Sequence, residues 1–123
     1  MNKELDYAYI AGLLDGEGTI SISNQFYLRA CIRNTDLKVL EWIQSFMGGA
    51  IYPDNRRVKP CYSLEYSSRT VEKFLSRLCP YLRIKKTQAE FALSLNLHRH
   101  QKLTLDERER RFEAYLKMRE LNL

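Results

Sequence analysis

Two acidic residues near the N-terminus stand in a run that could bind a metal ion, Asp15-Gly16-Glu17-Gly18. Carboxylate oxygens are the ligands that hard divalent cations prefer. The glycines on both sides of Glu17 permit a close approach of backbones and a sharp exit of the chain, so this carboxylate can be held in a fixed position. We therefore expect Glu17 to bind a metal, the alternative being a carboxylate that accepts backbone hydrogen bonds at a tight turn. For Asp15 we expect only a hydrogen-bond acceptor at the end of a helix.

The residues that lead into this run predict a helix with two packing faces. At 100° per residue, one arc collects small residues and an acid: Ala8, Ala11, Gly12, Asp15 and Gly16. The opposite arc is bulky and can cover a core: Tyr7, Ile10, Leu13 and Leu14. Small side chains let a second helix come unusually close. Because the chain holds a single copy of this run, the simplest partner is the same helix of a second chain, in a homodimer that brings two copies of Glu17 together.

The run from Ile10 to Gly18 resembles the signature of the LAGLIDADG homing endonucleases. Five positions match it, and the other four are conservative replacements; the matches are Ala11, Gly12, Leu13, Asp15 and Gly18. The resemblance implies an αββαββα unit whose first helix lies at the seam between two units. It also implies that Glu17, where the family more often has Asp, binds the divalent metal that cleaves DNA, Mg²⁺ or Mn²⁺, with help from the carbonyl of Gly16.

Two further residues receive roles from the same resemblance. Lys85, with Arg83 and Lys86 as alternatives, corresponds to a lysine that supports the scissile phosphate, and Asn34 corresponds to a polar residue that orients water. A cation near the phosphate would stabilise the negative charge added in the transition state. For any one of these three bases, the alternative is a solvated connection that touches phosphates without taking part in the chemistry.

Length and charge are consistent with this expectation. With 123 residues, the chain is predicted to form a single domain over residues 1–123, too short for two copies of such a unit. Its formal charge of +5 fits a polyanionic partner. The three cysteines are widely spaced, and we find no apolar stretch of membrane-spanning length and no secretory signal. We therefore expect a reducing, intracellular setting without a membrane partner, in a prokaryotic cytoplasm or an organelle matrix.

The remaining periodicities predict the elements that position these residues. Alternating apolar and polar residues predict a hairpin over residues 19–33, and Asp36 is a plausible N-cap for a helix that stops at Gly48-Gly49. A second hairpin is expected, with strands near residues 50–52 and 61–66, and then a helix that Ser68 or Thr70 could cap and Pro80 closes. Further helices are predicted over residues 87–98 and after a capping box at Thr104. The fold class is α+β, with one four-stranded antiparallel sheet.

The outer face of the two hairpins carries polar and basic residues. A twisted antiparallel sheet can follow a DNA groove, and arginine can bind guanine in bidentate fashion. We expect the following residues to contact DNA: Ser21, Ser23, Gln25, Tyr27, Arg29, Arg33 and, at the second hairpin tip, Arg56, Arg57 and Lys59. The alternatives are a solvated sheet face and a tip that only grips phosphate. His98-Arg99-His100 is interpreted as a surface feature or phosphate contact.

Taken together, these features predict a homodimeric homing endonuclease, of intron or intein origin, that cleaves both strands of a long, near-palindromic duplex. One alternative is a protein of the same fold that binds nucleic acid without cleaving it, as an intron RNA maturase or a DNA-binding regulator. Another is a dimerisation domain whose basic face is incidental.

Overall fold

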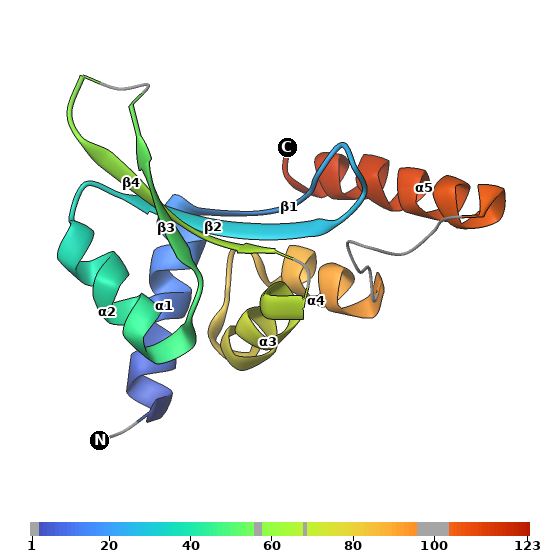
Figure 1. The fold of residues 1–123 in the computed structure, drawn as a ribbon. Helices are drawn as coiled ribbons and strands as arrows, with labels where there is room; N and C mark the ends of the chain where they lie inside the picture. The colour runs from blue at the N-terminus through green and yellow to red at the C-terminus, as the bar shows by residue number, and fades with distance from the viewer. Residues whose placement is uncertain (1–2, 56–57, 68, 96–103) are drawn as a thin grey trace.

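The computed structural model describes residues 3–55, 58–67, 69–95 and 104–123. Along the chain, the helices and strands are α1 (Lys3–Glu17), β1 (Gly18–Ile22), β2 (Leu28–Asn34), α2 (Leu37–Met47), β3 (Ala50–Asp54), β4 (Cys61–Ser67), α3 (Arg69–Leu78), the short 3₁₀ helix η1 (Cys79–Tyr81), α4 (Lys86–Leu95) and α5 (Leu105–Leu121). Figure 1 shows α1, α2, α3 and α4 on one side of the sheet, with α5 beside the β1–β2 hairpin. The predicted α+β class and αββαββα order are confirmed.

The four strands form one antiparallel sheet in the order β1-β2-β4-β3, so the two hairpins meet along β2 and β4. Successive side chains of a strand point to opposite faces. Ile20, Ala30 and Leu64 therefore face the helices and are buried. The residues between them lie on the other face, where Arg33 of β2 is opposite Ser63 of β4.

Two residues of the predicted small-residue arc of α1, Ala11 and Asp15, contact their own chain instead. Ile10 and Leu14 are fully buried as expected, but Ala11 is also fully buried, within the core of its own chain. The prediction that Ala11 belongs to the small-residue interface is therefore wrong. Its methyl group is small enough to bring α1 close to its neighbours in the core, so the open face of the helix is narrower than the helical wheel suggests.

The boundaries of α2 confirm the sequence signals. The side chain of Asp36 accepts a hydrogen bond from the N–H of Lys38, and Gly48 ends the helix with φ at +72°. Strand β3 extends further than predicted, because Pro53 and Asp54 lie within it and pair with β4. Proline is tolerated here because β3 is an edge strand, where the missing N–H interrupts no second ladder. Among the described residues, no helix is long and apolar enough to cross a membrane.

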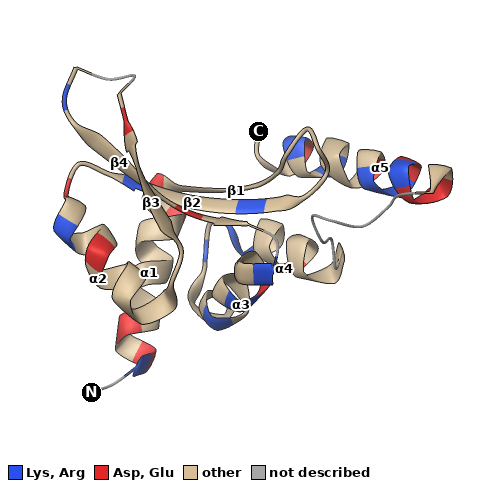
Figure 2. Ribbon diagram, in the orientation of Figure 1, with Lys and Arg blue, Asp and Glu red and all other residues tan. Residues whose placement is uncertain are grey.

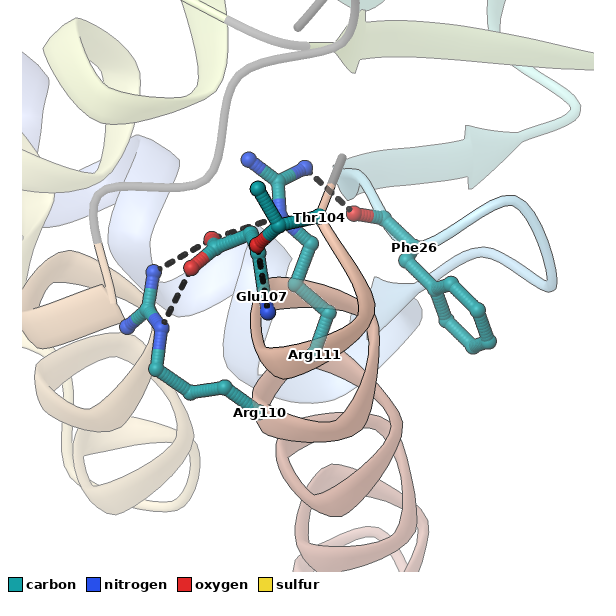
Figure 3. Close-up of polar contacts among 5 residues, drawn as sticks. All are labelled: Phe26, Thr104, Glu107, Arg110 and Arg111. Atoms are coloured by element: carbon teal, nitrogen blue, oxygen red, sulfur yellow. Dashed lines mark hydrogen bonds and ion pairs between the residues drawn. The ribbon is translucent and has the colours of Figure 1, made fainter. Parts of the chain in front are cut away.

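The C-terminal helix α5 anchors the tip of the β1–β2 hairpin. Thr104 is the N-cap and accepts a hydrogen bond from the N–H of Glu107, as predicted. The carboxylate of Glu107 binds Arg110 and Arg111, and the buried Arg111 also donates to the carbonyl of Phe26, as Figure 3 shows. These hydrogen bonds lower the pKa of Glu107 to about 2. Phe26 has a φ of +65°, so Arg111 supports the hairpin where its backbone conformation is least favourable.

The other end of α5 covers the outer edge of β1. The side chain of Asn122 donates a hydrogen bond to the carbonyl of Ile20 at 2.9 Å, and Gln88 of α4 donates to the carbonyl of Leu121 at 3.1 Å. An edge strand otherwise leaves backbone groups open to pairing with another chain. The additional C-terminal helices that the sequence predicts thus protect one edge of the sheet.

Candidate functional site

The structure brings together two of the predicted site residues at the end of α1. Glu17 is the last residue of α1, and Asn34 is the last residue of β2. The amide nitrogen Nδ2 of Asn34 donates to Oε2 of Glu17 at 2.7 Å, and Oδ1 of Asn34 accepts from the N–H of Asp36 at 2.8 Å. Because both ends of the amide are occupied, Asn34 holds the Glu17 carboxylate in one orientation.

A hollow beside this pair is lined by Glu17, Thr19, Arg33, Asn34, Thr35 and Cys61. Thr19, Thr35 and Cys61 were not predicted. Thr19 could have been found, because it follows Glu17 by two residues and shares the face of β1 with Ser21. Cys61 could not, because only the pairing of β4 with β2 places it there. The hollow therefore combines a carboxylate, an amide, two hydroxyl groups, one thiol and one arginine.

The donor set at Glu17 fits a hard divalent cation as one half of a site. Carboxylate and backbone carbonyl oxygens suit Mg²⁺, which keeps several waters and needs only one or two carboxylates from the protein. Glu17 and Gly16 are both exposed residues. Across the described residues, one chain contains no group of three or more His, Cys, Asp and Glu side chains that could hold a metal ion.

Lys85 lies at the end of α1 but is not among the residues that line the hollow. Its Nζ donates to the backbone carbonyl of Asp15 at 2.7 Å. In return, the Asp15 carboxylate accepts hydrogen bonds from the N–H groups of Arg83 at 2.8 Å and Lys85 at 2.9 Å. Partial burial raises the pKa of Asp15, but these backbone hydrogen bonds outweigh burial and leave the pKa below its ordinary value. Asp15 thus ties residues 83–85 to α1, which agrees with the acceptor role expected from the sequence.

One face of α1 is largely exposed within the described part of the chain, although the Tyr9 ring packs edge-on against Trp42 of α2. Leu5 and Tyr9 are 68% and 56% exposed, and Ala8 is exposed beside them. A Cβ atom added at Gly12 or Gly16 would have no heavy atom within 4 Å. Glycine inside a helix is destabilising relative to alanine. Neither glycine is required by contacts within its own chain, in contrast to Gly18, where an added Cβ would lie 2.8 Å from the carbonyl oxygens of Leu14 and Cys31.

Three of the nine predicted DNA-contacting residues lie in strands on the open face of the sheet, namely Ser21, Arg29 and Arg33. Arg29 and Arg33 on β2, Gln25 in the hairpin turn and Lys59 before β4 are exposed, and Ser21 and Tyr27 are half-buried. Figure 2 shows the basic positions on β2. Arg56, Arg57 and His98-Arg99-His100 lie outside the described residues.

Ser23 has a structural role that the sequence did not reveal. Its Oγ accepts hydrogen bonds from the N–H groups of Gln25 at 3.2 Å and Tyr27 at 3.4 Å. Its carbonyl also accepts from the N–H of Phe26, and its N–H donates to the carbonyl of Tyr27. These contacts close the β1–β2 turn, so the contribution of Ser23 to the sheet face is to shape the turn.

Acidic residues also lie on this face, beside both arginines. Arg29 donates to Glu65 of β4, with Nη2 and Oε1 2.5 Å apart, and Nε of Arg33 lies 3.9 Å from Oδ2 of Asp54. Sequence reasoning missed both acids. The sequence prediction puts Glu65 in the strand near residues 61–66 and Asp54 after the strand near residues 50–52. The strand order puts Glu65 on β4, next to β2, and Asp54 on β3, one strand further out. The face therefore has paired charges and is not uniformly basic.

Comparison with known proteins identifies the family. A family model described as a LAGLIDADG-like domain matches residues 4–79. No curated protein matches the sequence of the chain.

Solved structures share the fold. The homing endonuclease I-CvuI, crystallised with its target in the presence of Ca, is 20% identical with a TM-score of 0.72, and the match covers 97% of this chain and 81% of that chain. The archaeal intron-encoded homing endonuclease I-Vdi141I, complexed with DNA, is 18% identical with a TM-score of 0.82, covering 98% and 86%. The meganuclease I-SmaMI, bound to uncleavable DNA, is 19% identical with a TM-score of 0.62, but the match covers 94% of this chain and only 43% of that chain. With the family model matching more than half of its residues, this chain belongs to the LAGLIDADG-like family.

Proposed function

We propose that this protein is a homodimeric, divalent-metal-dependent endonuclease that binds a long, near-palindromic DNA duplex and cleaves both of its strands. The observation that carries the proposal is the orientation of Glu17 by Asn34, in a hollow at one end of an open sheet face. A carboxylate aligned in this way is suited to bind a cation, and the arginines of the same face are suited to bind the nucleic acid around it.

The homodimer rests on the exposed face of α1. Gly12 and Gly16 leave room for a second backbone, while Leu5 and Tyr9 supply apolar surface to bury beside them. The match to I-SmaMI covers only 43% of that longer chain, which leaves enough length there for a second unit of comparable size. Here, a second copy would supply that unit. The two-fold axis would bring two Glu17 carboxylates near one another and impose near-symmetry on the DNA site.

Within the proposed site, the Glu17 carboxylate and the Gly16 carbonyl would hold the cation. When bound, Mg²⁺ would supply charge stabilisation for the phosphoryl and leaving oxygens during phosphodiester hydrolysis. Asn34 keeps the Glu17 carboxylate oriented through the hydrogen bond from Nδ2 to Oε2. Arg33, which lines the same hollow, places a permanent positive charge where the scissile phosphate would approach. Lys85 fixes the end of α1 through the Asp15 carbonyl, and thereby positions Glu17 two residues further on.

A cleavage experiment tests the assignment of Glu17. Sites are selected from a randomised duplex library, with Mg²⁺ for cleavage and Ca²⁺ for binding. Removing a metal-binding carboxylate should cost several kcal/mol of transition-state stabilisation, so Glu17→Gln is expected to cut the selected site at least about 10³-fold more slowly. Binding in Ca²⁺ should persist. Glu90→Gln, an exposed change of the same charge on α4, is the control.

The other outcomes distinguish the alternatives. Undiminished cleavage by Glu17→Gln would refute the role of Glu17. If the wild type binds duplex DNA but never cleaves it, or prefers a folded RNA competitor, the protein is a nucleic-acid-binding relative of the enzymes. For a complex that neutralises about eight phosphates, affinity should fall roughly 10³- to 10⁵-fold between 50 and 200 mM salt. Binding that does not depend on salt would contradict the role of the basic sheet face.

A further inference from the structure

We propose that Arg29 and Glu65 act together as a base-reading couple that selects a G·C base pair in each half of the DNA site. The inference rests on the proposed function and concerns which residues determine specificity. Its basis is the ion pair between the two side chains on the open face of the sheet.

The register of the sheet explains why the two side chains meet. Arg29 is directly opposite Ser67, and Glu65 is directly opposite Cys31, so Arg29 and Glu65 are diagonal neighbours across β2 and β4. Diagonal residues on one face are about 7–8 Å apart, within reach of long side chains. The residue opposite Glu65 on β3 is Ala50. The residues opposite Glu65 on both neighbouring strands, Cys31 and Ala50, therefore have small side chains. A hollow lies beside the couple, and its lining includes Arg29, Ala50, Glu65 and Ser67.

Stability of the fold does not account for this pair. The Arg29 and Glu65 side chains are 44% and 27% exposed, and exposed ion pairs contribute about 0–1 kcal/mol. On a surface that binds DNA, a carboxylate also repels phosphate. Glu65 therefore lowers non-specific affinity, and a compensating benefit is expected in the recognition of bases.

The chemistry of the couple matches one kind of base pair. The ion pair uses one of the five guanidinium N–H donors and one of the two carboxylate oxygens, so both groups keep further hydrogen-bonding capacity. In the major groove, guanine presents two acceptors, O6 and N7, and its cytosine partner presents the N4 donor. Arginine is suited to the first and glutamate to the second. An A·T pair presents the acceptor N7 and the donor N6 on adenine, then the acceptor O4 and a methyl group on thymine, so it does not offer two adjacent acceptors followed by a donor.

The second acid–arginine contact on this face lacks these properties. Nε of Arg33 and Oδ2 of Asp54 are 3.9 Å apart, and the Asp54 side chain is only 7% exposed. A carboxylate that is so deeply buried cannot reach the edge of a base. The Arg33 contact therefore balances charge on the sheet, whereas Glu65 lies where it can accept a hydrogen bond from DNA.

The test is to select binding sites from a randomised duplex library in Ca²⁺, using the wild type, Glu65→Gln, Arg29→Gln and the control Glu90→Gln. The wild type should enrich G·C at one base pair of each half-site. A good base contact is worth about 5- to 150-fold in discrimination, so Glu65→Gln should weaken that preference by about tenfold and leave the other base pairs unchanged. Arg29→Gln should alter the same base pair, and Glu90→Gln should alter none.

Three results would overturn the inference. Glu65→Gln could raise affinity equally for all sequences, which is the behaviour of a carboxylate that only repels phosphate. Arg29→Gln and Glu65→Gln could change different base pairs, which would separate the two side chains. If both variants change the same base pair but the wild type does not prefer G·C there, the couple reads another feature. Failure of the proposed function is distinct from all three. A protein that does not bind DNA would enrich no duplex even as the wild type, and one that binds without cleaving would still show the base preference in Ca²⁺.

Discussion

Gly12→Ala separates the contacts that α1 makes within its own chain from those it would make with a second chain. Within the chain, an added Cβ at Gly12 meets no heavy atom within 4 Å. Alanine is favoured over glycine in a helix by about 0.8–1 kcal/mol, so the isolated chain should become more stable by about that amount. If α1 packs on its copy, however, the substitution puts one extra methyl group from each chain into the closest part of the interface.

The expected loss of dimer stability follows from those two methyl groups. Overpacking costs about 1–3 kcal/mol for each insertion, which sums to roughly 2–6 kcal/mol for the pair. A change of this size raises the dissociation constant of the dimer by about 30-fold to more than 10⁴-fold. Sedimentation equilibrium over a range of protein concentrations measures this constant, and urea unfolding at a concentration below it measures the stability of the single chain.

Gly18→Ala is the matched control, because it adds the same methyl group at a position that the chain itself crowds. There the new Cβ would lie 2.8 Å from two backbone oxygens, so this variant should lose stability as a monomer. A Gly12→Ala protein that dimerises as tightly as the wild type would refute the pairing of α1 with its copy. A loss of monomer stability in Gly12→Ala would instead refute the openness of this helix face.

Three further substitutions test the contacts that support the site and the hairpin. Asp15→Asn should lower the free energy of unfolding by about 2 kcal/mol at neutral pH, the scale of hydrogen bonds to a charged group. Folding lowers the pKa of Asp15, so the stability difference between wild type and Asp15→Asn should be complete above the unfolded pKa of about 4. It should shrink as pH falls through the folded pKa of Asp15, and a difference that grows in acid would contradict this reasoning. Thr104→Ala removes the cap of α5 and should cost about 1 kcal/mol in urea unfolding, with Leu105→Ala as an exposed control that leaves the cap intact. Arg111→Met should cost roughly 2–3 kcal/mol and increase hydrogen exchange at the Phe26 turn, and unchanged exchange there would show that Arg111 does not hold the hairpin.

Much of the architecture could be predicted because the signals are local. The alternation around Ile20 and Ile22, the Asp36 cap and the Gly48-Gly49 stop each depend on residues within a few positions of one another. Backbone geometry translates such patterns directly into strands, caps and helix ends. The end of β3 was missed because Pro53 is disfavoured in most strands and is accommodated here only by the position of β3 at the sheet edge.

The sequence by itself determined the glycine-flanked carboxylate of Glu17, a helix with a stripe of small residues, and two hairpins with arginines on one side. Only the tertiary structure decided which long-range neighbours these residues have. It brought the Asn34 amide into a hydrogen bond with Glu17, and the Lys85 ammonium into a hydrogen bond with the Asp15 carbonyl. It also buried Ala11 within its own chain and paired Glu65 with Arg29. The physical reason is that periodicity specifies the face on which a residue lies, whereas strand order and register specify which side chain lies opposite it.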